Sequence, residues 1–62
     1  MTDEQVKQWH ISNVKQDLEK CELYMSKCYN MLDNGKCNQA RDELIAIYRH
    51  LMKMIDELNY TI

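Results

Sequence analysis

Apolar residues recur at alternating steps of three and four along most of this chain, and this spacing constrains the fold more than any other feature. Such spacing places side chains on one face of an α-helix and is typical of helices that pack along each other. The chain has no proline and a single glycine, so both runs can form long helices. We therefore expect an all-α fold. The first run is Ile11, Val14, Leu18, Cys21, Met25, Cys28 and Leu32, and the second is Ala40, Leu44, Ile47, Leu51, Met54 and Leu58.

Short polar segments mark where the helices begin and end. Residues 2–5, Thr-Asp-Glu-Gln, have the form of a capping box, which predicts a helix from about Asp3. Asn34 and Gly35 suit the left-handed conformation that closes a helix, and Asn38 can cap the next one. We predict an antiparallel two-helix hairpin, with helices at about 3–33 and 38–59, that forms one domain over residues 1–62.

A turn centred near Lys36 would bring the two runs into register. Residues whose numbers add up to 72 would then lie at the same height, and the apolar residues would form six layers without further adjustment. This agreement between local pattern and overall arrangement is typical of a sequence that specifies one structure. The predicted layers are Val14 with Leu58, Leu18 with Met54, Cys21 with Leu51, Met25 with Ile47, Cys28 with Leu44, and Leu32 with Ala40.

A lone hairpin of 62 residues covers only one side of each of these residues, so we expect it to associate. Additional apolar residues beside the two runs support this expectation. A homodimer of hairpins forming a four-helix bundle would bury them, as would an unidentified protein target, and the sequence leaves both open. Trp9 lies off the pattern, where it could cover the open end of the bundle or anchor a partner. The interface residues that we predict are Ile45, Tyr48, Met52 and Ile55 in the second helix and Trp9, Tyr24 and Met31 in the first.

No group of residues suggests catalysis, a metal or another cofactor. Cys21 and Cys28 are one heptad apart, about 10.5 Å along a helix, which is too far to bridge each other or to share one zinc ion. His10 and His50 lie far apart in the hairpin, and two helices enclose no pocket for a substrate. We predict a protein that is not an enzyme, with Cys37 as an exposed thiol of unassigned role.

Charge and cysteine usage bear on partners and compartment. Ten acidic and eight basic residues give a net charge of −2 and form no block of one sign, which disfavours nucleic acid. No apolar run approaches the roughly 18 residues of a membrane span, and the first ten residues lack the pattern of a signal peptide. An odd number of cysteines favours reduced thiols, so we expect a cytoplasmic protein with no membrane contact.

These features favour a small protein-binding regulator or inhibitor that acts through an apolar helical face, of a kind often encoded by phages or mobile elements. Two alternatives stay open. In its length and two-helix layout the chain resembles the Rop family of plasmid copy-number regulators, dimeric four-helix bundles that bind paired RNA loops. That resemblance would imply an RNA-binding dimer, but it carries over no individual residue. The other alternative is a structural or assembly subunit of a larger helical complex.

Overall fold

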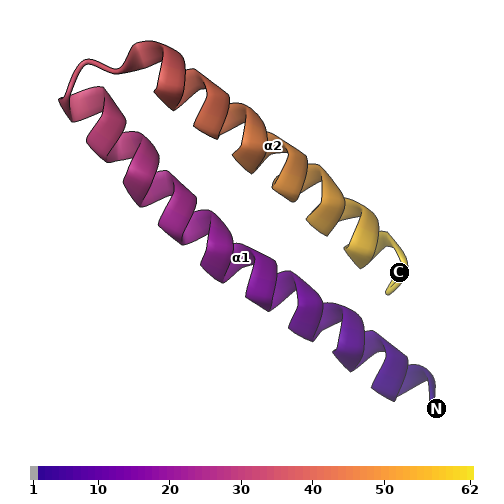
Figure 1. Ribbon diagram of the computed structural model, residues 1–62. Helices are drawn as coiled ribbons and strands as arrows, with labels where there is room; N and C mark the ends of the chain where they lie inside the picture. Colours follow the sequence, from indigo (N-terminus) through magenta and orange to yellow (C-terminus); the bar gives the residue numbers. More distant parts are fainter. Residues whose placement is uncertain (1) are drawn as a thin grey trace.

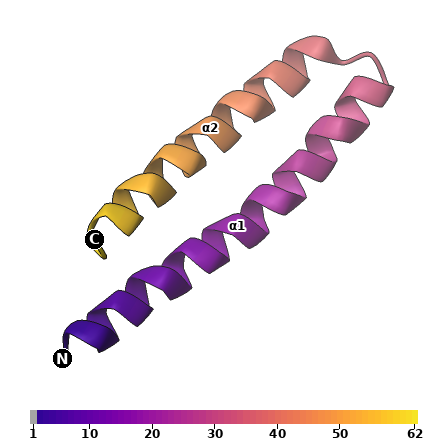
Figure 2. The same ribbon diagram turned by 180° about the vertical axis from the view of Figure 1, so that it is seen from behind.

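The computed structural model describes residues 2–62 as two antiparallel helices joined by a short connection (Figure 1). Helix α1 spans Asp3–Asp33 and helix α2 spans Cys37–Asn59. The two helices run side by side and bring both ends of the chain to the same end of the molecule, as the reverse view also shows (Figure 2). The predicted all-α hairpin is therefore confirmed. Neither helix combines the length and apolarity that crossing a membrane requires.

The start of α1 has the capping box that the sequence predicts. The Thr2 hydroxyl accepts a hydrogen bond from the Gln5 backbone N–H at 3.2 Å, and the Gln5 side-chain oxygen accepts one from the Thr2 backbone N–H at 2.9 Å. These two bonds satisfy donors that the first turn of a helix leaves free. Helix α1 consequently begins at Asp3, where its first acidic residues also favour the positive helix end.

The connection consists of residues 34–36, and its centre is Gly35 rather than Lys36. Gly35 has a φ of +71°, in the left-handed region that glycine adopts without strain. The Lys36 N–H donates to the Met31 carbonyl, and the Lys36 carbonyl accepts the first bond of α2 from Ala40. Lys36 thus ends one helix and begins the next. The prediction that Asn38 caps α2 is wrong, because the helix has already begun at Cys37, with no side-chain cap.

Each apolar run has two alternating positions in every seven residues, and only one of the two is buried in the core of the hairpin. The core residues are Val14, Cys21 and Cys28 from α1 and Ala40, Ile47 and Met54 from α2. Two helices can enclose only the side chains on the line between their axes, while those on either side are covered from one direction. The six predicted layers are therefore not buried as such. Cys28, expected beside Leu44, instead directs its thiol to the Ala40 carbonyl at 3.6 Å.

Candidate interaction surface

The residues that flank the buried line divide the hairpin into two sides. In an α-helix, residues three and four positions after a buried residue lie on opposite sides of it. Glu57 follows Met54 by three, and His50 follows Ile47 by three. Glu57 contacts His10, and His50 stacks on Tyr24 with ring centroids 5.4 Å apart. These contacts show that the residues three positions after a buried residue lie on the same side of the hairpin in both helices. The residues four positions after a buried residue therefore lie together on the other side.

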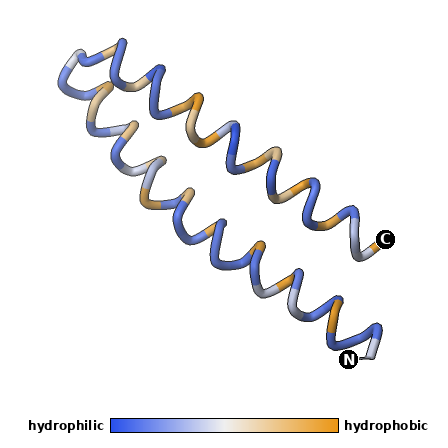
Figure 3. Tube along the Cα trace, turned by 45° about the vertical axis from the view of Figure 1, so that its right-hand side comes forward, coloured by the Kyte–Doolittle hydropathy of each residue, from blue (hydrophilic) through white to orange (hydrophobic). Residues whose placement is uncertain are grey.

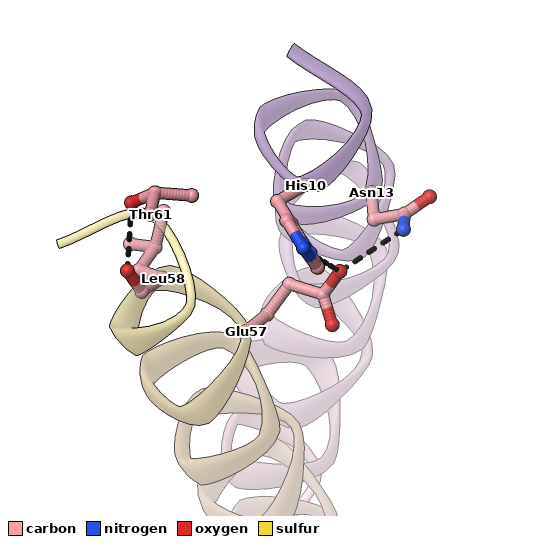
Figure 4. Close-up of polar contacts among 5 residues, drawn as sticks. All are labelled: His10, Asn13, Glu57, Leu58 and Thr61. Carbon is pink, nitrogen blue, oxygen red and sulfur yellow. Dashed lines mark hydrogen bonds and ion pairs between the residues drawn. The ribbon is translucent and has the colours of Figure 1, made fainter. Parts of the chain in front are cut away.

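The first side carries polar contacts between the helices near the open end (Figure 4). The Glu57 carboxylate accepts a hydrogen bond from the Asn13 amide at 3.0 Å and lies 2.6 Å from Nδ1 of His10. The His10 ring also stacks on Tyr60, with centroids 5.5 Å apart. The hydrogen bond from Asn13, and then the one with His10, lower the pKa of Glu57 below its ordinary value. Hydrogen bonds and ring contacts thus join the two helices on this side.

The second side is apolar from Ile11 to Leu32 on α1 and from Leu44 to Leu58 on α2, and we call it the leucine face. Apart from the half-buried Ile11, its residues keep between 37% and 53% of their surface exposed. Apolar residues recur along the full length of both helices (Figure 3), and on this side they are not interrupted by a charge. Large exposed apolar patches on proteins are typical of protein–protein or membrane interaction sites and of ligand-binding grooves. The leucine face consists of Ile11, Leu18, Met25 and Leu32 from α1 and Leu44, Leu51 and Leu58 from α2.

The predicted strip on α2 continues the leucine face around that helix. Tyr48 and Ile55 each follow a leucine of the face by four residues, and Ile45 and Met52 lie one step further out. These four side chains are between 42% and 61% exposed. We call this set, Ile45, Tyr48, Met52 and Ile55, the outer strip. On α1 the corresponding positions, four residues after Ile11, Leu18 and Met25, carry Lys15, Glu22 and the exposed Tyr29.

The remaining predicted interface residues do not join this surface. Tyr24 and Met31 lie on the opposite side and are partly buried there, Tyr24 against His50. Trp9 is 56% exposed and meets the His10 ring edge-on at 5.0 Å. Helix α1 has 31 residues and α2 has 23, so the first turns of α1 extend past the end of α2 at Asn59 (Figure 1). Val6 and Ile62 line a hollow at this open end. The seven predicted residues are thus divided among three places.

Sequence reasoning assigned the leucines to the core and so missed them as surface residues. Their spacing was visible, but both apolar positions of the repeat look alike in a sequence, and only the rotation of each helix decides which one is enclosed. The polar contact between His10 and Glu57 joins residues far apart in the chain and had no local signal.

The cysteines and acids of the described chain form no further site. Cys21 and Cys28 are buried in the hairpin core, and Cys37 is exposed at the first residue of α2. Within residues 2–62, no three His, Cys, Asp or Glu side chains lie close enough together to hold a metal ion. Comparisons with models of protein families, with curated proteins and with solved structures found no match for this chain.

Proposed function

We propose that this chain is a non-enzymatic interaction protein that docks its leucine face on another helical surface, and that its first partner is a second copy of itself. The observation that carries this proposal is the row of leucines and methionine left about half exposed along one side of the hairpin. Two such faces packed together form a four-helix bundle. In that bundle both apolar positions of the repeat reach a common core.

The energetics favour a partner over a free surface. Fully burying a leucine or methionine side chain contributes about 2 kcal/mol, so covering the remaining half contributes about 1 kcal/mol. Six such side chains from each of two copies would contribute on the order of 12 kcal/mol to a dimer. Association costs roughly 4 to 15 kcal/mol, so this gain is large enough to offset much or all of the cost. A second copy offers an apolar face of the same length.

The dimer leaves part of the apolar surface uncovered. Ile45 and Met52 lie on α2 beyond the edge of the leucine face, and face-to-face packing would not enclose them. We propose that a regulator or inhibitor of this design holds its bundle together with the leucine face and presents the exposed part of the outer strip to its target. Apolar anchors at helical spacing are sufficient for docking of this kind.

Sedimentation equilibrium under reducing conditions, over a wide range of concentration and at low and high salt, tests the proposal. A dimer whose dissociation constant rises little with salt is expected, because apolar contacts are not screened. A monomer that keeps its helical spectrum at high concentration would contradict self-association. A dimer that dissociates steeply with added salt would contradict apolar docking.

A further inference from the structure

We infer that the two hairpins of the dimer pack with their connections at opposite ends, related by a two-fold axis that lies in the interface and crosses both helices at the level of Leu18 and Leu51. This inference rests on the proposed function and specifies the partner's orientation. It follows from the order of residues on the leucine face and along its two edges.

The leucine face repeats itself when it is turned end over end. Leu18 and Leu51 lie nearly the same number of residues from Gly35, at the centre of the connection, so they share a level near the middle of the hairpin. On α1, Ile11 and Met25 lie seven residues to either side of Leu18. On α2, Leu44 and Leu58 lie seven residues to either side of Leu51. Rotation about an axis at this level therefore places these apolar side chains opposite each other, whereas Leu32, fourteen residues after Leu18, lies opposite Glu4.

The charged edge on α1 is complementary to itself under the same rotation. Lys15 precedes Leu18 by three residues and Glu22 follows it by four, and both are exposed. With α1 packed against α1 of the partner copy in antiparallel orientation, each Lys15 lies opposite a Glu22. Flanking positions of this kind form the ion pairs that set the orientation of packed helices. Two such pairs form in each dimer.

The apolar edge on α2 is also complementary to itself. Tyr48 precedes Leu51 by three residues and Ile55 follows it by four. In the antiparallel contact of α2 with α2 of the partner copy, Tyr48 lies opposite Ile55. Both side chains, 61% and 53% exposed in the single hairpin, then gain an apolar neighbour.

The other symmetric arrangement, with both connections at the same end, mismatches these edges. It packs α1 against α2 of the partner copy, at matching distances from the two connections. Lys15 would then lie opposite Ile55, and Glu22 opposite Tyr48. Each charge would lose water without gaining an opposite charge, which is unfavourable. The edges therefore select the arrangement with the connections at opposite ends.

A distance between spin labels on Cys37 separates the two arrangements. Cys37 is exposed while Cys21 and Cys28 are buried, so a nitroxide reagent should label Cys37 alone, and a Cys37→Ser variant should take up no label. Cys37 lies about 14 residues from the level of Leu51, or about 21 Å at the rise of an α-helix, so the two labels would be about 40 Å apart. In the alternative dimer, both connections lie at the same end. Because packed helices are about 8–10 Å apart, the two labels would then lie within roughly 25 Å of each other.

Pulsed electron–electron double resonance on the labelled full chain is expected to give a distance near 40 Å between the two labels, about twice the length of 14 helical residues. A distance below about 25 Å would overturn the opposite-end arrangement and leave the dimer itself intact. A sample that sediments as a monomer would instead contradict the proposed function. The two failures are therefore distinguishable.

Charge reversal at the α1 edge supplies a second, independent test. Lys15→Glu or Glu22→Lys would place like charges opposite each other twice in the dimer, raising the dissociation constant on the order of tenfold. The double variant K15E/E22K restores both pairs and is expected to return within about threefold of the original value. Lys20→Glu, the same charge change away from the leucine face, is the matched control. If the double variant dimerises no better than the single ones, the arrangement is wrong.

Discussion

Truncation of Leu51 to alanine measures how much of this side chain the partner covers. Leu51 is 39% exposed in the hairpin and belongs to the middle level of the leucine face. Fully burying a leucine contributes about 2 kcal/mol, so the part left for the partner contributes about 1 kcal/mol. The dimer contains two copies, and Leu51→Ala should therefore weaken it by about 2 kcal/mol, a rise in dissociation constant of roughly 30-fold.

Leu23→Ala is the matched control for this experiment. Leu23 is 66% exposed and follows the buried Cys21 by two residues, which places it on the far side of α1 from α2. The same three carbon atoms are removed, but no partner is expected to cover this position. The dissociation constant of Leu23→Ala should stay within about threefold of the unmodified chain, a difference below 1 kcal/mol.

Sedimentation equilibrium of the two variants, with circular dichroism on the same samples, supplies the assay. The spectra establish that each variant is still helical at the concentration used. Equal dissociation constants for Leu51→Ala and Leu23→Ala, with both variants helical, would refute the assignment of the leucine face as the dimer interface.

Further predictions concern the edge of the interface, the open end and the connection. Tyr48→Glu or Ile55→Glu should weaken association while leaving a helical spectrum at high concentration, and unchanged dimerisation in both would remove the outer strip from the interface. Hydrogen bonding lowers the pKa of Glu57 in the folded hairpin, so its stabilising effect is present above the ordinary value of 4.5 and is lost as pH falls through the lowered value. In an acid titration followed by circular dichroism, Glu57→Gln should lose less stability at low pH than the unmodified chain. Equal losses in the two chains would show that this carboxylate does not support the fold. Gly35→Ala forces a side chain into a left-handed backbone and should reduce the free energy of unfolding by about 1 kcal/mol at fixed chain concentration, as urea unfolding would measure. An unchanged urea midpoint would contradict the role given to this glycine.

The hairpin itself could be predicted from sequence because its signals are local. The capping residues at Thr2 and Gln5 lie within one turn of each other, and Gly35 meets a backbone requirement of its own residue. The alternating spacing of apolar residues then predicts two long helices and their antiparallel packing. Each of these signals acts over a few residues, where the chemistry of the side chains is decisive.

The surface could not be predicted in the same way, because it depends on how far each helix rotates toward the other. Val14 and Leu18 belong to the same apolar run, yet the first is buried and the second remains 47% exposed. Tyr24 was expected on the interface, but it stacks on His50 on the opposite side. Both outcomes follow from contacts between residues far apart in the chain, which a one-dimensional pattern does not encode.

The most direct test of the leucine face is the accessibility of its methyl groups in solution. A chain with isotope-labelled leucine and methionine methyl groups would be titrated with a soluble paramagnetic probe and followed by NMR. The titration would be made at chain concentrations above and below the dimer dissociation constant that sedimentation gives. The methyl groups of Leu18, Met25 and Leu51 are expected to become protected as the dimer forms, while those of Leu23 stay accessible. Leucine-face methyl groups that remain as accessible as those of Leu23 at the highest concentration would contradict the leucine face as the dimer interface.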